Sequence, residues 1–238
     1  MKAAVVLGVG PSKGLGATLA RRFAGHDLHI VLGGRTAESL ATVAAEIETN
    51  GGTCTPAVCD ATDESAVAAL IDAVPGTLEL AIYNVGNNTP GRISDMSLDY
   101  FEQSLRLGPV GGFLFGRATV NRMMKEGGGT LLYTGASASL RGRKNFGAFN
   151  ASKGALRNLA QAMAKEYAEH NIHVGHVVID GPVGGDKIEL GFPEYAAKLG
   201  EAGTISLEGI ADAFEFLYRQ PPRAWSFEVD VRTSQERW

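Results

Sequence analysis

The chain has 238 residues, of which 45% are apolar and 20% are charged, close to the averages for globular proteins. Its 22 basic and 26 acidic residues give a formal charge of −4, so no cationic excess exists to neutralise a nucleic-acid backbone, and we expect no nucleic-acid partner. No stretch approaches the roughly 20 apolar residues of a membrane-spanning helix, and we expect no membrane contact.

Short apolar runs alternate with amphipathic segments along the chain. We expect strands at 3–7, 28–32, 53–59, 78–83, 130–134, 173–179 and 227–231, and helices at 14–24, 37–49, 64–74, 110–125 and 147–170. Runs that are apolar throughout are typical of parallel strands covered on both faces. The repeated strand–helix order therefore predicts an α/β fold: a single Rossmann-like doubly wound sheet of seven mainly parallel strands with helices on both faces.

No linker or low-complexity tract interrupts the sequence, so we expect one domain over residues 1–238. The longest irregular stretch, 180–204, is rich in glycine and proline. Irregular stretches of this length in compact domains are usually lids or binding loops. We therefore expect a lid or substrate loop at about 180–204, with Tyr195 as a side chain that closes over the substrate.

Cysteine and histidine give no metal-binding pattern. Cys54 and Cys59 lie five residues apart with no histidine nearby, and we interpret them as small packing side chains rather than ligands. His170 ends a predicted helix, whereas His173 and His176 differ by three along a strand and face opposite sides. We expect no metal. The few cysteines fit a reducing compartment, and we expect a cytoplasmic protein.

A glycine-rich loop joins the first strand to the first helix, with the sequence Gly8-Val9-Gly10-Pro11-Ser12-Lys13-Gly14-Leu15-Gly16. Glycines let the backbone approach a pyrophosphate, and the helix N-terminus adds oriented N–H groups and a positive dipole. A purely structural turn is the alternative. The strand–loop–helix context favours a dinucleotide site.

The spacing Gly10-x-x-x-Gly14-x-Gly16 resembles that of the short-chain dehydrogenase/reductase (SDR) family, whose loop reads T-G-x-x-x-G-x-G. Val9 stands in place of that threonine. The resemblance covers nearly the whole chain, and it continues through Asp60, Asn84-Val85-Gly86 (family N-A-G), Ala151-Ser152-Lys153 and Asp180-Gly181-Pro182-Val183 (family P-G-x-V).

The end of the second strand indicates NADP(H) rather than NAD. An acidic residue there would bind the adenosine ribose of NAD, but Gly34 fills the place and Arg35 follows. Together with Lys13, Arg35 can pair with a 2′-phosphate; alternatively, Arg35 is an ordinary solvated residue. The resemblance implies cofactor-binding roles for Gly10, Ser12, Lys13, Gly14, Leu15, Gly16, Arg35, Asp60, Ala61, Asn84, Val85, Gly86, Lys153, Gly181 and Val183.

The resemblance also implies a catalytic tetrad of Asn, Ser, Tyr and Lys, and most of it is missing. Lys153 occupies the lysine position, whereas Gly108, Ala136 and Phe149 occupy the other three. A positioned general acid contributes about 10²–10⁴-fold to a rate, so the family's usual carbonyl reduction is disabled while cofactor binding is not. Restoring all three residues is expected to create or raise carbonyl reductase activity.

Other side chains are weaker candidates for the missing donor, because a surface or packing role explains each of them. Thr134 and Ser139 are second choices, and strand alternation should turn Ser137 away from the site. The remaining candidates are Arg143, Asn145, Asp180 and Tyr195. The basic cluster 141–144 either attracts an acidic substrate or is a solvated loop.

Three functions stay open: an NADP(H)-dependent oxidoreductase with a non-standard or impaired proton-donor site acting on an unknown small molecule, a non-catalytic NADP(H)-binding sensor or partner subunit, and a structural oligomer without cofactor. The first is favoured because the nucleotide side of the site is intact. The resemblance implies a homodimer or homotetramer built on helices 110–125 and 147–170. Gly111, Gly112, Gly116 and Ala118 would let those helices approach their mates.

Overall fold

Seven parallel strands form the centre of the structure, a computed structural model that describes residues 1–236. The strands are β1 (Lys2–Leu7), β2 (His29–Gly34), β3 (Cys54–Val58), β4 (Thr77–Tyr83), β5 (Gly129–Thr134), β6 (Ile172–Ile179) and β7 (Glu228–Val231). They lie in the order β3-β2-β1-β4-β5-β6-β7, and every neighbouring pair is parallel. The predicted Rossmann-like α/β fold is confirmed. The strand order reverses between β1 and β4, which is where ligands bind in such sheets.

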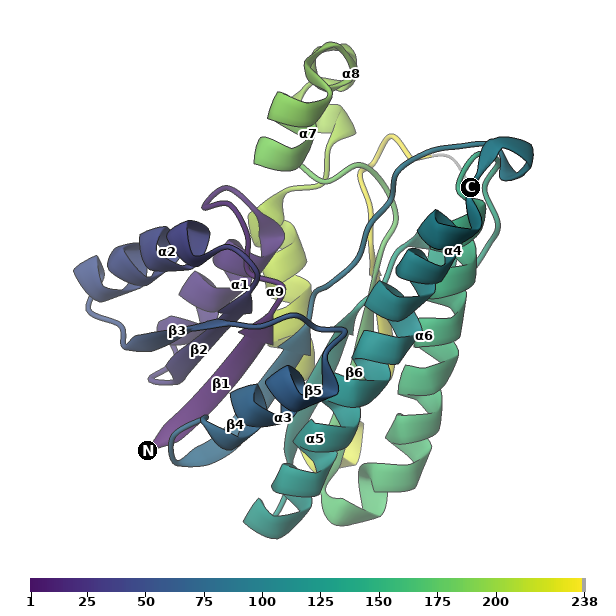
Figure 1. Cartoon of the computed structure of the whole chain (residues 1–238). Coiled ribbons are helices and arrows are strands. Elements are labelled where there is room, and N and C mark those ends of the chain that lie inside the picture. Colours follow the sequence, from purple (N-terminus) through teal and green to yellow (C-terminus); the bar gives the residue numbers. More distant parts are fainter. Residues whose placement is uncertain (237–238) are drawn as a thin grey trace.

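Helices cover both faces of the sheet (Figure 1). The main helices are α1 (Leu15–Ala24), α2 (Ala37–Thr49), α3 (Glu64–Asp72), α4 (Leu98–Leu105), α5 (Gly111–Glu126), α6 (Gly147–Tyr167) and α9 (Leu207–Tyr218). Buried Phe23, Leu40 and Phe214 place α1, α2 and α9 on one face, and buried Leu70 and Phe115 place α3 and α5 with α6 on the other. Over residues 1–236, no helix combines the length and apolar character needed to cross a membrane.

The expectation that 180–204 is irregular is wrong. This segment contains two short helices, α7 (Asp186–Gly191) and α8 (Pro193–Leu199), which lie above the carboxyl ends of the strands (Figure 1). Pro193 starts α8 because its fixed φ suits the first helical turn, and Gly200 follows its end. The frequent glycines mark helix boundaries here, not a continuous loop. Helices α4 and α9 were also not expected from the sequence.

The glycines of α5 face inward, contrary to the expectation that they pack against a second copy of the chain. A Cβ at Gly111 or Gly116 would overlap the hydroxyl of Tyr83 or Tyr133, respectively, and one at Gly112 would overlap Leu156. These glycines therefore make room for side chains of the same chain. The outward face of α5 instead carries half-exposed apolar residues, among them Phe113 and Met124.

A buried polar network joins the last two strands to α6. His176 on β6 is fully buried, and its Nδ1 lies 2.9 Å from Oε2 of Glu228 on β7. Arg157 on α6 donates to both oxygens of Glu228, at 2.6 and 2.9 Å. Burial lowers the pKa of His176 despite its carboxylate partner, and the hydrogen bond from His176 lowers the pKa of Glu228 to about 2.

This network makes stability depend on pH. Both pKa values are lower in the folded state, so the unfolded chain binds more protons and the free energy of unfolding should fall as the pH is lowered. His176 contributes to this fall from about pH 7 to about pH 5, and Glu228 contributes below about pH 5. The His176→Asn variant should show a shallower fall, with a remainder from His173, whose pKa burial also lowers. Denaturant melts at each pH measure this. His170→Asn, at a surface position, is the control; equal slopes in both variants and the wild type would contradict the prediction.

Candidate active site

The loop between β1 and α1 presents backbone rather than side chains. Gly14 caps α1 with no side-chain hydrogen bond, and the first turn has no acidic residue, so its N–H groups remain available. A Cβ at Gly16 would overlap the carbonyl oxygen of Gly8, whereas one at Gly10 would meet nothing within 4 Å. The loop is therefore close-packed beneath and open above Gly10. A pyrophosphate fits such a backbone-lined space at a helix N-terminus.

The end of β2 excludes an acidic side chain by its packing. A Cβ at Gly34 would overlap the carbonyl oxygen of Val9, so the position that carries the ribose-binding acid in NAD sites has no room for one. Arg35 and Lys13 are exposed, and within residues 1–236 neither side chain has a hydrogen-bond or ion-pair partner. Two cations without counter-ions thus flank the entrance to the loop.

Ser12 is engaged within the protein. Its hydroxyl donates to Oε1 of Glu46 at 2.5 Å, and Arg21 binds Oε2 of Glu46 at 2.7 Å and the Ser12 carbonyl oxygen at 3.0 Å. The structure therefore leaves the Ser12 hydroxyl pointing to α2. Any contact between Ser12 and a cofactor would therefore use the backbone of Ser12 and not its hydroxyl.

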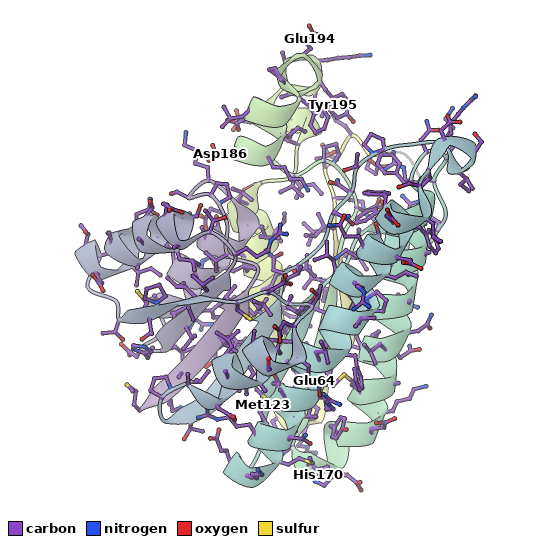
Figure 2. The ribbon with its side chains drawn as sticks, viewed as in Figure 1. Glu64, Met123, His170, Asp186, Glu194 and Tyr195 are labelled. Carbon is purple, nitrogen blue, oxygen red and sulfur yellow. The ribbon has the colours of Figure 1, made fainter. Side chains whose placement is uncertain are left out.

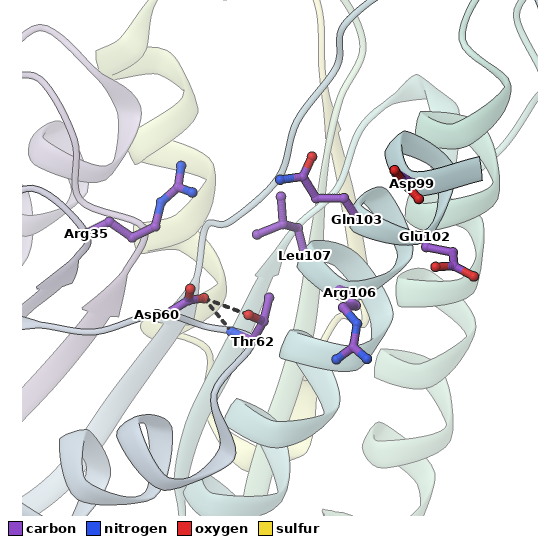
Figure 3. A pocket seen from close by; sticks show the side chains of 8 residues that line it. All are labelled: Arg35, Asp60, Thr62, Asp99, Glu102, Gln103, Arg106 and Leu107. Atoms are coloured by element: carbon purple, nitrogen blue, oxygen red, sulfur yellow. Dashed lines mark hydrogen bonds between the residues drawn. The ribbon is translucent and has the colours of Figure 1, made fainter. Parts of the chain in front are cut away.

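A cavity of about 250 Å³ lies beside Arg35 (Figure 3). Arg35 stands on one side of it and the side chains of α4 and the following turn on the other, with Asp60 and Thr62 between them. The Oδ1 atom of Asp60 accepts hydrogen bonds from the N–H and the hydroxyl of Thr62, at 2.9 and 2.8 Å, so the carboxylate is held in place. Ala61, next to it, is buried. The structure therefore brings together Arg35 and Asp60, which the sequence assigns to the adenosine half of the cofactor. Sequence reasoning missed Arg106, which also lines the cavity.

The side-chain amide of Asn84 holds three strand ends together. Its Nδ2 donates to the carbonyl oxygen of Gly8 at 3.2 Å, and its Oδ1 accepts from the hydroxyl of Thr134 at 2.9 Å. Lys153 on α6 then reaches the same cluster: its Nζ donates to the carbonyl oxygens of Thr134 at 2.7 Å and of Val85 at 3.5 Å. A Cβ at Gly86 would lie 3.3 Å from this Nζ. The structure thus brings together Asn84, Val85, Gly86 and Lys153.

Lys153 is a buried ammonium with only carbonyl partners in the described chain, 1–236. Burial, with a smaller contribution from the charge of Lys187, lowers its pKa to about 8. Phe149 lies one helical turn before it on α6, and Ala136 is buried at the start of the turn η3 (Ser137–Ser139). Among the four positions that the sequence resemblance assigns to the tetrad, Lys153 therefore carries the only titratable side chain.

Gly108 lies in a π-helical turn, η2 (Arg106–Val110), at the junction of α4 and α5. Single π-turns of this kind often occur at functional sites. The Oγ of Ser152 donates to the carbonyl oxygen of Ser104 at 2.7 Å and fills the space beside Gly108, so a Cβ there would overlap it. An asparagine at this position would therefore require the Ser152 hydroxyl to rotate away from Ser104.

The weaker donor candidates have other partners. Thr134 donates to Asn84, and Ser139 Oγ accepts from the N–H of Ala136 at 3.1 Å and lies 3.4 Å from Nε2 of His176. Ser137 begins a buried helical turn, so the argument from strand alternation does not apply to it.

Asp180 is buried and forms an ion pair with Arg141. The Arg141 guanidinium lies 2.8 Å from Oδ1 of Asp180, so neither side chain is a free charge.

Other expected residues lie at the surface. Arg143, Lys144 and Asn145 are exposed beyond β5, and Tyr195 is half exposed on α8. His170, labelled in Figure 2, lies at the end of the molecule away from α7 and α8. In the described part of the chain, His, Cys, Asp and Glu form no group of three that could hold a metal ion.

The segment after β6 reaches over the glycine loop. The N–H of Asp186 donates to the carbonyl oxygen of Lys13 at 3.0 Å, and Figure 2 labels Asp186 on the lower side of α7. The backbone of Ile205 bonds to the N–H of Gly184 and to the carbonyl oxygen of Pro182. This pairing leaves the N–H of Val183 without a partner among residues 1–236.

Lys187 on α7 contacts the segment that follows β4. Its Nζ donates to Oδ1 of Asn88 at 2.8 Å. Sequence reasoning missed Lys187, because a lysine between Asp186 and Glu189 looks like ordinary surface.

The geometry agrees with comparisons to known proteins. The sequence model described as short chain dehydrogenase matches residues 2–184. Gluconate 5-dehydrogenase of Gluconobacter oxydans (strain 621H) is 29% identical over 177 residues, 73% of this chain and 69% of that enzyme. A crystal structure of a short-chain dehydrogenase from Rhodopseudomonas palustris has a TM-score of 0.83 at 34% identity, covering 97% of this chain and 98% of its own. A metagenomic short-chain oxidoreductase in complex with NADP has a TM-score of 0.82 at 25% identity, covering 98% and 97%. The chain therefore belongs to the short-chain dehydrogenase/reductase family of oxidoreductases.

The packing of Gly108 against Ser152 is testable. Gly108→Ala should destabilise the fold by about 1–3 kcal/mol, the usual cost of overpacking. In a Ser152→Ala background the same change should cost less, because the overlapping Oγ is gone. Thermal melts of the four proteins measure this coupling. Gly154→Ala, on α6 with nothing within 4 Å of its added Cβ, is the control and should be neutral or stabilising. Strictly additive effects would show that Ser152 is not the obstacle.

Proposed function

We propose that the protein is an NADP(H)-dependent oxidoreductase of the SDR type with a non-standard proton-donor site. The observation that carries this proposal is the geometry around the glycine loop. The N-terminus of α1 has no side-chain cap, and the space above Gly10 is open. Gly34 leaves no room for an acidic side chain, and the side chains of Arg35 and Lys13 have no partner within residues 1–236. The NADP complex of the metagenomic relative supports the choice of NADP over NAD. The proposed cofactor contacts are those expected from the sequence, with Ser12 acting through its backbone.

When bound, NADPH supplies a hydride. The residues of this chain then have to orient the nicotinamide and supply a proton. In this proposal the free N–H of Val183 binds the carboxamide and Lys153 binds the ribose, as the family resemblance implies. At the tetrad positions only the Lys153 ammonium carries a transferable proton, which it would regain from water. Reduction of an alkene or iminium would need less help at an oxygen than reduction of a ketone.

A non-catalytic NADP(H)-binding protein, a sensor or partner subunit, is the second candidate. It is supported by the apolar side chains of Ala136 and Phe149, which cannot donate or accept a proton. We further propose one domain over residues 1–238 with a lid at about 180–204, and a homodimer or homotetramer that uses the outward face of α5. The free thiols Cys54 and Cys59 are compatible with a cytoplasmic location.

The cofactor preference predicts that NADPH binds more tightly than NADH. Arg35→Ala should weaken NADPH binding roughly 10–100-fold, since a charged hydrogen bond is worth about 1.5–3 kcal/mol, and leave NADH nearly unaffected. Fluorescence titration measures both affinities, with Lys125→Ala on α5 as the control. An equal loss for the two cofactors would argue that Arg35 does not contact a 2′-phosphate.

Turnover decides between the two candidate functions. We expect NADPH consumption with some member of a panel of ketones, enones and iminium compounds, followed by absorbance. Because the protonated form of Lys153 is the donor, the rate should fall as the pH rises through about 8. Lys153→Met should abolish turnover. A blank panel combined with tight NADPH binding would favour the non-catalytic function.

Restoring hydroxyl-bearing side chains at two of the four expected tetrad positions should raise the rate of ketone reduction. Phe149→Tyr places a phenol one turn before Lys153, and Ala136→Ser adds a hydroxyl at the other position. The double variant should reduce ketones about 10²-fold faster than the wild type. Ala136→Ser alone is the control. A double variant that binds NADPH with no gain in rate would show that the assignment of these positions is wrong.

A further inference from the structure

Two lysine ammonium groups converge on one short segment after β4. Lys153 reaches it from α6, with its Nζ 3.5 Å from the carbonyl oxygen of Val85. Lys187 reaches it from α7, with its Nζ 2.8 Å from Oδ1 of Asn88, three residues further along. The segment from Val85 to Asn88 therefore lies between one cation fixed in the core and another carried by the proposed lid.

No acid compensates these two charges within residues 1–236. The partners of Lys153 are carbonyl oxygens, and the partner of Lys187 is a neutral amide. Glu189 accepts from the N–H of Gly185, and Asp180 is bound by Arg141. The carboxylate of Asp186, next to Lys187 in the sequence, forms no ion pair with either lysine within the described residues. The two ammonium groups also act on each other, because the charge of Lys187 lowers the pKa of Lys153. An anion is the missing component of such an arrangement.

The remaining surroundings of Lys153 are apolar at the positions that would touch a substrate. Ala136 and Phe149 offer no hydrogen bond. Lys187 is exposed and its amide partner Asn88 is exposed too, so an incoming acceptor can replace Asn88 at little cost. A lysine ammonium binds a carboxylate or a phosphate as a point charge. One positive charge beside a neutral amide matches the single charge of a carboxylate better than the charge of about −1.5 to −2 on a phosphate monoester.

We propose that Lys187 recognises the substrate, and that the substrate is an oxo acid, or the matching hydroxy acid in the reverse reaction, whose carboxylate binds this ammonium. This inference rests on the proposed NADP(H)-dependent function. Lys187 is then a specificity-determining residue on the lid, whereas Lys153 serves the cofactor and the proton.

The test uses calorimetric titration of the protein loaded with NADP⁺. The probes are 2-, 3- and 4-oxo acids of short chain length, their methyl esters, and dihydroxyacetone phosphate. The wild type should bind at least one acid about tenfold more tightly than its ester, the effect of one charge-assisted hydrogen bond. Lys187→Met should lose this preference, Lys187→Arg should keep it, and neither should change the affinity for NADP⁺. Lys198→Met, the same loss of charge on exposed α8, should behave as wild type.

Three results would overturn the inference. Lys187→Met could still bind an acid more tightly than its ester, or the wild type could bind dihydroxyacetone phosphate more tightly than every oxo acid. The third is that the wild type loaded with NADP⁺ binds none of the acids. A loss of NADP⁺ affinity in Lys187→Met would place the lysine on the cofactor instead and would also overturn it. A wild type that does not bind NADP⁺ refutes the proposed function itself, and this inference with it.

Discussion

The amide of Asn84 is the contact on which the rest of the site depends. By bonding Gly8 on one side and Thr134 on the other, it fixes the relative positions of the ends of β1, β4 and β5. The Thr134 carbonyl in turn receives the ammonium of Lys153. The glycine loop, the segment after β4 and α6 are thus parts of one hydrogen-bonded unit, and a shift of any strand end would be felt at the buried lysine.

Around this unit, close packing of the backbone limits which side chains can line the proposed cofactor site. Gly16 and Gly34 admit no side chain, whereas the space above Gly10 is open. An acid that would favour NAD is excluded at Gly34 by sterics rather than by repulsion, and the cations at Lys13 and Arg35 are left without partners. At the positions that the resemblance assigns to the opposite half of the site, Gly108, Ala136 and Phe149 provide no side-chain hydrogen bond. Burying Lys153 with only carbonyl partners is costly for folding, so its presence argues for a role beyond stability.

The sheet and the glycine loop could be read from the sequence because they depend on local pattern: uninterrupted apolar runs and glycines at strand ends. Features that depend on contacts distant along the chain could not. The pairing of Asp180 with Arg141 spans 39 residues and that of Lys187 with Asn88 spans 99, and neither leaves a local signal.

Three further features of the structure differ from what the local sequence pattern predicts. The inward direction of the α5 glycines is not predictable locally, because a sequence does not show which face of a helix meets large side chains. The helices within 180–204 are hard to predict because glycines that end short helices look like those of an irregular stretch. The alternation rule does not reach Ser137, because the strand stops at Thr134.

The fit between Gly108 and Ser152 constrains how this sequence can change over evolutionary time. The two positions lie on different elements, yet a side chain at the first is blocked as long as the hydroxyl of the second remains bonded to Ser104. A lineage that places asparagine at position 108 must therefore give up the hydrogen bond between Ser152 and Ser104, by rotating the hydroxyl or by replacing the serine. The hydroxyl of Ser152 thus adds a cost to every side chain at position 108.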